Sequence, residues 1–600
     1  MNSSHQREEF LCIIKEGGVF MEKTWDLTDL YLSFQDKQFL KDIEDIQKML
    51  DDLKVYPDLE VTNDNVKDYL KKDNECQELV EKVYSYINLT MSANTQDYEA
   101  IQFASKLENI LAGFAKDNTR IQKWLTSFDT NHVEDEYIKE HLFILKEIQE
   151  HQKYMLDEQT ELALAQMKTT GSSAWLKYKD QMISSMSITM DNQIYPLTEV
   201  LNMAYSKDKD IRKKAYEAEI KAYQSVEEGI ASALNAIKGE AITMAKLRGY
   251  DSVLDRTLID SRITKTTLDV LIKTIQKALP MFEKYYQVKA KKLGYTNGLP
   301  WYDLYAPIID NHMDYSFEEG SQFVVEQFTT FSDSLGQYAK KAIDKHWIDV
   351  YPRQGKVGGA FCQNLHCIKQ SRFLLNYGND FSDTITLAHE LGHGFHGHCL
   401  NHETAFNSDY PMPIAETAST FCETIVKKAA LKKASKQEQL MILENELSDC
   451  AQVIVDIYSR FLFESRFIEK RIEAPQSVDD IKALMIESQK DAYGKGLDHR
   501  YLHPYMWTWK PHYYEVDYAF YNFPYAFGLL LAKGLYGMYQ KEGPAFAKTY
   551  ETFLSLTGKM SLEDVAKSVG IDLQDEKFWQ NSIDMIQEDL NQFYQLLEEF

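Results

Sequence analysis

Apolar side chains recur at helical spacing along most of the chain. Within residues 39–50, and again within 79–87, they return every three or four positions, so each segment has one apolar face. Such faces are typical of amphipathic helices that pack against a common core. Residues 137–155 and 199–295 have the same character, the latter with long stretches rich in Ala, Lys and Glu. The pattern predicts a mainly α-helical fold.

Three stretches depart from this period. Residues 184–198 alternate around Asp191-Asn192, which supplies a turn, so we expect a small hairpin there. Residues 356–365 and 372–377 are typical of strands, and they come directly before a further apolar helical segment. We therefore expect a small sheet beside that helix. We place a lobe boundary close to the hairpin, near residue 198.

Composition narrows the class of protein. Six hundred residues are too many for one simple core, so two or more lobes are expected. The formal net charge is −26, from 66 Lys and Arg against 92 Asp and Glu. This surplus argues against nucleic acid or an anionic membrane as a partner, because both need a basic surface. Seven cysteines, with no pair at CxxC spacing, predict reduced thiols and a cytoplasmic location.

The first residues differ from the rest of the chain. The apolar run Phe10–Ile14 is too short, and too acidic on its N-terminal side, for a signal peptide. We interpret residues 1–20 as a leader, or as the product of a start codon assigned too far upstream of Met21. The predicted organisation is then an N-terminal helical lobe over 21–198 and a second lobe over 199–600, which carries the candidate chemistry.

The candidate chemistry centres on residues 386–398, which contain His-Glu-x-x-His from His389 to His393. Residues four apart on a helix lie one turn apart, with Cβ atoms about 5–6 Å from each other. Both imidazoles can therefore bind one zinc ion at about 2.0–2.1 Å. Glu390 lies about 100° round the helix and can reach a zinc-bound water without being a ligand. The pattern is that of a zinc hydrolase, with two ligands and a general base in a five-residue motif.

The residues around the motif favour a buried helix. Ser382 or Asp383 can cap its start. Gly392, Gly394 and Gly397 each weaken a helix by about 0.5–1 kcal/mol relative to Ala. Three such glycines indicate that another part of the chain approaches the helix backbone closely.

A catalytic zinc needs a third protein ligand and one open position. The extended pattern with a third His fails, because His396 stands at its Gly position and Cys399 at its His position. Our candidate is Glu416, which opens a predicted helix after two prolines. Glu423 follows seven residues later on the same face. Glu403, in a polar loop, is the rival ligand, and three histidines that are more typical of supporting or surface positions remain loose candidates: His396, His398 and His402.

Four motifs together resemble oligoendopeptidase F, of the thimet-oligopeptidase-like M3 zinc metallopeptidases. They are His389–His393, the segment Ile-Ala-Glu-Thr-Ala-Ser around Glu416, Gly358–Cys362, and the aromatic block His512–Gly528. The similarity runs from about Met21 to the C-terminus. It implies two helical lobes that enclose a deep substrate channel with zinc on its floor, and it implies oligopeptide substrates.

The aromatic block has a further implied role. Roughly half of the residues from His499 to Phe527 are His, Tyr, Trp or Phe, a density that usually reflects core packing. The resemblance implies that a His and one or two Tyr from this region contact the substrate carbonyl, and His512 and Tyr525 match best. Tyr518 and Tyr521 stay unranked, because the register of the match is ambiguous by one residue.

Gly358 and Gly359 precede the first predicted strand of the sheet. Glycine lets another backbone come close, and an open sheet edge binds an extended peptide through main-chain hydrogen bonds. A simple bulge or turn explains the two glycines equally well from spacing alone. The resemblance favours the substrate-binding interpretation.

The sequence therefore predicts a zinc-dependent endopeptidase that hydrolyses internal bonds of short oligopeptides, with one zinc per chain on His389, His393 and Glu416. Glu390 would be the general base. A zinc hydrolase of another class, or a peptide-binding protein without activity, are the alternatives. The intact Glu390 argues against the latter, because binding alone needs no base.

Overall fold

The computed structural model describes residues 23–309 and 313–600. The proposed leader, residues 1–20, lies outside the described residues. The chain divides into two compact units, each built from two segments. The first comprises Met1–Ile121 and Asp314–Ala405, and the second comprises Gln122–Met313 and Phe406–Phe600. The lobe boundary predicted near residue 198 falls inside the second unit and stays a prediction.

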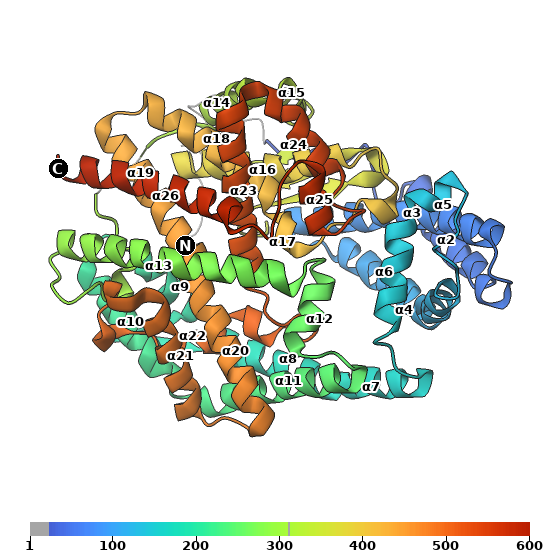
Figure 1. The fold of residues 1–600 in the computed structure, drawn as a ribbon, viewed down its shortest axis with the longest axis horizontal. Helices are drawn as coiled ribbons and strands as arrows, with labels where there is room; N and C mark the ends of the chain where they lie inside the picture. Colours follow the sequence, from blue (N-terminus) through green and yellow to red (C-terminus); the bar gives the residue numbers. More distant parts are fainter. Residues whose placement is uncertain (1–22, 310–312) are drawn as a thin grey trace, which may run out of the picture. The chain divides into compact units, whose positions relative to one another are not determined.

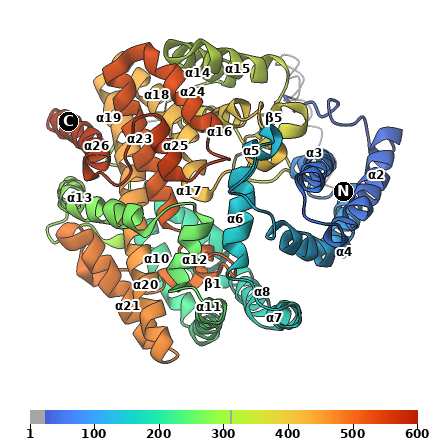
Figure 2. The same ribbon diagram turned by 45° about the vertical axis from the view of Figure 1, so that its right-hand side comes forward.

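The first unit combines helices with a small sheet. Its helix α2 packs on α3, and α14 packs on α15, as Figure 2 shows. Glu81 of α3 joins the helices to the sheet region, because its carboxylate accepts hydrogen bonds from the backbone of His366 and Cys367 at 2.9 and 2.8 Å. The elements of this unit are α2 (Lys37–Leu53), α3 (Asn63–Ala93), α4 (Tyr98–Leu125), α14 (Phe317–Phe331), α15 (Asp333–Asp344), β3 (Ile348–Asp349), β4 (Phe361–Leu365), β5 (Gln370–Leu374) and α16 (Phe381–Cys399).

The sheet of this unit has the strand order β3-β5-β4. β4 pairs with β5 in antiparallel register, with Cys362 opposite Phe373, and β3 pairs with β5 in parallel. β4 is thus an edge strand. Both β4 and β5 contact α16, so the sheet lies beside the helix that carries His-Glu-x-x-His. This confirms the small sheet predicted from the sequence.

The second unit is almost entirely helical. Its helices before residue 314 are α5 (Glu136–Glu140), α6 (Leu142–Gln152), α7 (Glu158–Thr170), α8 (Ser172–Ser184), α9 (Leu197–Asn202), α10 (Lys209–Tyr223), α11 (Glu227–Arg248), α12 (Val253–Asp260) and α13 (Lys265–Lys292), with strands β1 (Ser187–Met190) and β2 (Gln193–Pro196). Those after residue 405 are α17 (Met412–Ala415), α18 (Thr417–Lys433), α19 (Lys436–Ala451), α20 (Ile457–Glu473), α21 (Val478–Tyr493), α22 (Met506–Trp509), α23 (Phe523–Glu542), α24 (Phe546–Ser555), α25 (Leu562–Ser568) and α26 (Glu576–Leu597).

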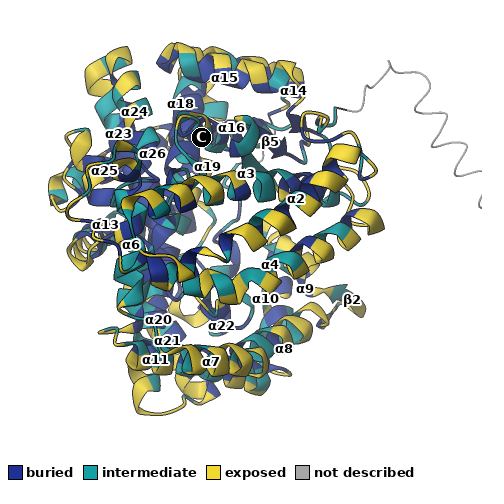
Figure 3. Ribbon diagram, turned by 90° about the vertical axis from the view of Figure 1, so that its right-hand side faces the viewer, coloured by how far each residue is buried: buried dark blue, intermediate teal, exposed yellow. Residues whose placement is uncertain are grey.

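Helix α23 runs through the interior of the second unit. It packs against α18 and α26, and the three are neighbours in Figure 1. Phe527, Leu530 and Leu531 of α23 are buried, which explains its apolar sequence on all sides. Surface helices such as α7 and α11 instead show an exposed face and a more buried one, as Figure 3 shows. The mainly α-helical prediction is confirmed.

The predicted hairpin is present as β1 and β2. Its two central residues, Asp191 and Asn192, have φ angles of 51° and 65°. Left-handed conformations at both positions are required by the tight two-residue turn that suits paired strands, and Asp and Asn tolerate them. Among the described residues, no helix is both long enough and apolar enough to cross a membrane.

Candidate metal centre and carbonyl-binding segment

Helix α16 begins at Phe381, about two turns before the motif. Asp380 is its N-cap, and Asp380 and Asp383 form a capping box. The Asp383 carboxylate accepts hydrogen bonds from the backbone of Gly378 and Asp380 at 2.8 and 2.9 Å. The expectation that Ser382 or Asp383 caps the helix was wrong, because Asp380 satisfies the first free N–H groups and Asp383 closes the box from inside the helix.

The two histidines of the motif converge on one point. His389 Nε2 and His393 Nε2 are 3.1 Å apart, and the ring planes meet at 82°. Two nitrogens bound to one tetrahedral zinc at about 2.0–2.1 Å would stand about 3.3 Å apart. The observed separation therefore fits two imidazoles that share one metal ion. Both side chains are half-buried, as ligands that face an open position must be.

Glu390 follows His389 and is buried, with 5% of its surface exposed. Cys362 of β4 is its electrostatic neighbour. Burial raises the pKa of the Cys362 thiol well above its usual value, and the charge of Glu390 raises it further. The thiol is therefore neutral at physiological pH, and no charge from Cys362 competes with Glu390.

The glycines of α16 let the sheet come close. A Cβ added to Gly394 would lie 2.3 Å from Tyr338 Oη and 2.5 Å from Phe373, and one added to Gly397 would lie 2.3 Å from the Asn364 side chain. Only glycine fits at these distances. This confirms the prediction that another part of the chain approaches the helix backbone.

The remaining candidates of the first unit lie away from the paired nitrogens along α16. His398 packs against Tyr338, with ring centroids 5.1 Å apart, and burial lowers its pKa. His402 is exposed. Glu403 lies in the turn that follows the last helical residue, Cys399, which is about 9 Å along the axis from His393 at 1.5 Å per residue. A side chain that starts beyond the end of the helix is poorly placed to bind a metal at its middle.

Glu416 stands in the second unit, between α17 and α18, and is the N-cap residue of α18. Ser419 Oγ donates a hydrogen bond to Glu416 Oε2 at 3.2 Å. Gly528 of α23 packs against the residue, since a Cβ at that position would lie 3.1 Å from Glu416 Cβ. Glu423, two turns later, accepts a hydrogen bond from Lys427 Nζ at 2.8 Å. Lys427 thus holds Glu423, while a hydroxyl holds Glu416.

The aromatic block of the second unit gathers three of the four candidates. His512 belongs to a 3-10 helix, Pro511–Tyr514, and Tyr525 lies in the first turn of α23. His512 Nε2 and the Tyr525 hydroxyl are 3.4 Å apart. The ring of Tyr521 lies 5.6 Å from that of His512. The hydroxyl of Tyr518 is instead hydrogen-bonded to Ser261 Oγ at 2.6 Å, a residue far from it in the sequence.

The protonation of this cluster follows from burial. Burial, together with the charges of Arg460 and Lys510, lowers the pKa of His512 to about 4 against the opposing charge of Asp456. Burial and the neighbouring Tyr521 and Glu416 raise the pKa of the Tyr525 hydroxyl. At pH 7 the imidazole is therefore neutral and the phenol is protonated, so both can donate a hydrogen bond to an oxygen that gains negative charge.

A buried ion pair, which sequence reasoning missed, holds the connection between His512 and Tyr525. Glu464 of α20 accepts hydrogen bonds from the backbone of Phe520 at 3.0 Å and from the Asn522 side chain at 3.2 Å. Lys238 of α11 donates to the same carboxylate at 2.6 Å, and both charged side chains are 1% exposed. Phe520 has a φ of 57°, a strained conformation for a large side chain. Nothing local in the sequence signals this support.

Gly358 and Gly359 lie in the bend before β4, and a Cβ at either position would meet nothing within 4 Å. The predicted strand from residue 356 starts only at Phe361. Gly359 has a φ of 80° and so needs to be glycine for its conformation. The approach of a second backbone to this bend stays a prediction.

Comparisons with known proteins show the family of the chain. The profile of peptidase family M3 matches residues 202–585, and that of oligopeptidase F matches residues 115–187. The chain belongs to peptidase family M3. This confirms the resemblance seen in the four motifs. Membership makes the protein a metalloendopeptidase, as predicted, and the family implies zinc as its metal.

Relatives of this M3 peptidase cover nearly its whole length. Oligopeptidase PepF of Bacillus subtilis is 24% identical over 599 residues, which cover 96% of this chain and 87% of the relative. An oligoendopeptidase F homolog of Borreliella burgdorferi is 25% identical, with 94% and 96% covered. The crystal structure of oligoendopeptidase-F from Enterococcus faecium has a TM-score of 0.65 at 17% identity and covers 94% of this chain and all of that one, which shows the shared fold.

Proposed function

We propose that this M3 peptidase is a zinc-dependent endopeptidase that hydrolyses internal bonds of short oligopeptides. One zinc per chain would be held by His389, His393 and Glu416. The observation that carries the proposal is the 3.1 Å separation of the two Nε2 atoms on α16, with the buried Glu390 beside them. Two imidazoles and a carboxylate form a donor set typical of catalytic zinc.

Bound zinc would polarise the scissile carbonyl and lower the pKa of a water molecule to about 7. The protein residues do the rest. Glu390 accepts the proton of the attacking water and later gives it to the departing amine. His512 and Tyr525 donate hydrogen bonds to the carbonyl oxygen as negative charge develops on it.

The remaining candidates take supporting roles in this proposal. Glu423, seven residues after Glu416 on α18, is a supporting carboxylate that Lys427 holds in place. Tyr521 lies against the ring of His512 and keeps it in place, and Tyr518 supports Tyr521 from behind. Gly358 and Gly359 leave the backbone before edge strand β4 open to an extended peptide, which would add to the sheet there. The odd cysteine set without CxxC spacing supports a cytoplasmic location.

The substrate class is tested by offering one cleavable sequence in three forms. The three forms are a free peptide, the same sequence within an unfolded protein, and the same sequence in a surface loop of a folded domain. The free peptide has about 6–20 residues, a length estimated from a rise of about 3.3 Å per residue. We expect cleavage of the free peptide and little cleavage of the other two. Relatives named oligopeptidase support this expectation.

The readout is the cleavage rate by mass spectrometry, with zinc measured by elemental analysis on the same sample. Glu390→Gln is the control, since it removes the base and retains the metal donors. Equal cleavage of all three forms would overturn the oligopeptide limit. A zinc-loaded enzyme that cuts none of them would favour a zinc hydrolase of another class or a peptide-binding protein.

A further inference from the structure

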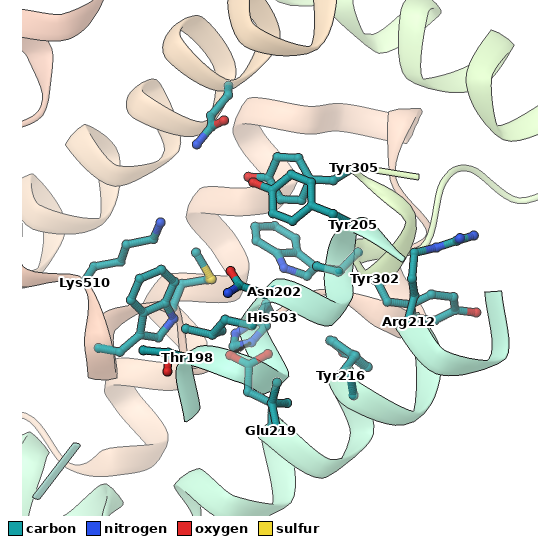
Figure 4. A pocket seen from close by; sticks show the side chains of 18 residues that line it. Thr198, Asn202, Tyr205, Arg212, Tyr216, Glu219, Tyr302, Tyr305, His503 and Lys510 are labelled. Atoms are coloured by element: carbon teal, nitrogen blue, oxygen red, sulfur yellow. Dashed lines mark hydrogen bonds and ion pairs between the residues drawn. The ribbon is translucent and has the colours of Figure 1, made fainter. Parts of the chain in front are cut away.

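A pocket of about 300 Å³ opens within the second unit, bounded by α9, α10, α22 and the short 3-10 helices Met203–Tyr205 and Trp301–Asp303. Its volume is at the lower end of the range for small-molecule sites, about 300–1,000 Å³. It is therefore large enough for one amino-acid residue or a small organic acid, and too small for a longer piece of chain. Figure 4 shows polar side chains entering it from several sides.

Two of its charged side chains already have partners. Arg212 donates to Asp303 Oδ1 at 2.8 Å and to the backbone carbonyl of Ser206 at 2.7 Å. Glu219 accepts from the Tyr223 hydroxyl at 2.9 Å and lies 3.2 Å from His503 Nε2. Hydrogen bonds within the protein thus hold both side chains in place.

Lys510 differs from them. In the parts of the chain that the structure describes, its ammonium has no hydrogen bond and no carboxylate within 4.0 Å, and its neighbour is the Trp509 ring at 4.1 Å. Trp509 also lines the pocket, and its indole Nε1 is buried without an acceptor among the described residues. A buried donor without a partner costs about 1–3 kcal/mol. Lys510 and Trp509 thus line the same cavity, and neither side-chain nitrogen has an acceptor among the described residues.

The opposite wall is aromatic. Tyr205 and Tyr305 stack with ring centroids 4.9 Å apart and an interplanar angle of 30°. Figure 4 shows this pair across the pocket from Lys510. Stacked rings offer a flat apolar surface to a large side chain. The pocket therefore presents donors for an anion on one side and an apolar surface on the other.

The pocket also lies next to the proposed carbonyl-binding segment. Lys510 precedes His512 by two residues, and its charge lowers the pKa of His512. Two residues of chain span at most about 7 Å. A group bound by Lys510 is therefore within a few peptide units of an oxygen bound by His512.

We propose that this pocket binds the C-terminal residue of the peptide substrate, with its carboxylate on Lys510 and Trp509 and its side chain against Tyr205 and Tyr305. The inference rests on the proposed function and adds a specificity determinant to it. A carboxylate fits better than phosphate, because Glu219 faces the same cavity and repels a dianion more strongly than a monoanion. The site favours substrates with a large apolar residue at a free C-terminus.

The test compares two peptides of the same sequence that end in phenylalanine, one with a free carboxylate and one with a C-terminal amide. We expect the enzyme to cut the acid with a kcat/KM about 10–100-fold higher, the range for a hydrogen bond to a charged group. Lys510→Met should bring the ratio of acid to amide close to one, and Lys510→Arg should keep most of it. Lys495→Met, at an exposed lysine of the same unit, should keep the ratio of the unmodified enzyme.

A binding measurement separates this inference from the proposed function. Titration calorimetry on the Glu390→Gln enzyme, with both peptides, reports the preference without turnover. A preference that Lys510→Met abolishes supports the pocket even if hydrolysis fails. Equal affinity for acid and amide overturns it even if the enzyme is an active peptidase. Binding of N-acetylphenylalanine with no preference among the peptides would also overturn it, because the pocket would then take free acids.

The pH dependence offers a further check. Burial and the charge of Arg460 lower the pKa of Lys510, the carboxylates of Asp456 and Glu219 oppose them, and the resulting pKa is about 8. His512, the other titrating neighbour, stays neutral above pH 5. The preference for the acid should therefore be complete at pH 6.5 and decline as the pH rises past 8. A preference that stays constant to pH 10 in the unmodified enzyme would contradict a role for the Lys510 ammonium.

Discussion

Helix α16 and the segment from His512 to Tyr525 contribute to the proposed reaction in different ways. On α16, one continuous helix places His389, Glu390 and His393, and their relative positions follow from helix geometry alone. Between His512 and Tyr525, the chain passes through a 3-10 helix, a strained turn at Phe520 and the start of α23. Its side chains meet because remote residues hold that path.

The difference predicts how each region responds to mutation. A change elsewhere in the protein can weaken the packing of α16, but it leaves residues four apart on one face. The positions of the aromatic side chains are less secure, because they depend on Glu464, Lys238 and Ser261, which belong to other segments of the chain. We expect catalysis to be lost through direct substitutions on α16 and through both direct and remote substitutions at the aromatic segment.

The largest expected effect concerns Glu416, the proposed third ligand, which does not belong to α16. Glu416→Ala should release zinc and abolish activity, because two imidazoles alone hold the metal weakly. Elemental analysis after dialysis, together with the peptide rate, measures both. Glu423→Ala should cost about 10–100-fold in zinc affinity or activity, as expected of an orienting group.

Glu403→Ala is the matched control, an acidic residue beyond the end of α16. It should keep zinc. If Glu403→Ala empties the site while Glu416→Ala leaves it full, the ligand assignment is wrong and the first unit holds the metal without help from the second.

The next largest effect concerns Glu390, the proposed general base on α16. Glu390→Gln should keep zinc and lower kcat by about 10²–10⁴-fold, because an amide cannot accept the proton of the attacking water. Zinc content and kcat are measured on the same preparation. Near-normal turnover by a fully loaded variant would exclude Glu390 as the base.

A smaller loss of kcat is expected from substitutions in the aromatic segment, His512 to Tyr525. Tyr525→Phe and His512→Asn should each lower kcat by about 10²–10³-fold with little change in KM, because each removes one donor to the developing oxyanion. Tyr518→Phe is the control, since its hydroxyl is bonded to Ser261. It should cost less than Tyr525→Phe. The reverse order would move the carbonyl contact from Tyr525 to Tyr518.

Remote support is tested by Lys238→Met. The change leaves the buried Glu464 carboxylate without its ion-pair partner, which costs about 3–5 kcal/mol of stability. We expect a lower Tm and reduced kcat, with zinc content unchanged. Lys265→Met removes an exposed ion pair with Asp269, and such pairs contribute about 0–1 kcal/mol. This variant should therefore change neither Tm nor kcat. Equal effects of the two variants would show that the aromatic segment does not depend on the buried pair.

The smallest effect is a pH dependence of stability. The folded protein holds the pKa of His512 at about 4, below the value of about 6.5 for an unfolded chain. Between these values the unfolded state binds a proton that the folded state does not, so stability falls as the pH drops from 6.5 toward 4. His512→Asn should therefore lower the loss of Tm between pH 7 and pH 5. His402→Asn, at an exposed histidine, should leave that loss unchanged.

The sequence by itself determined the helical character of the chain, the hairpin at Asp191-Asn192, the sheet before α16 and the spacing of the proposed ligand pair on that helix. These features depend on neighbours within a few positions, so periodicity and spacing suffice to predict them. The sequence also predicted that another segment packs closely against α16 at Gly394. Glycine weakens a helix, so its presence indicates that a larger side chain would not fit there.

Only the tertiary structure decided the cap at Asp380, the partner of Tyr518 and the buried pair of Lys238 and Glu464. It also brought Lys510 and Trp509 into one pocket with Tyr205 and Tyr305. Along the sequence, Tyr205 is about 300 residues from Lys510, and Tyr305 is about 200 residues from it. Whether a charged or polar side chain is paired depends on groups that the fold brings together from distant segments. No local pattern encodes that, because the free energy of burying such a group is set by its neighbours in space.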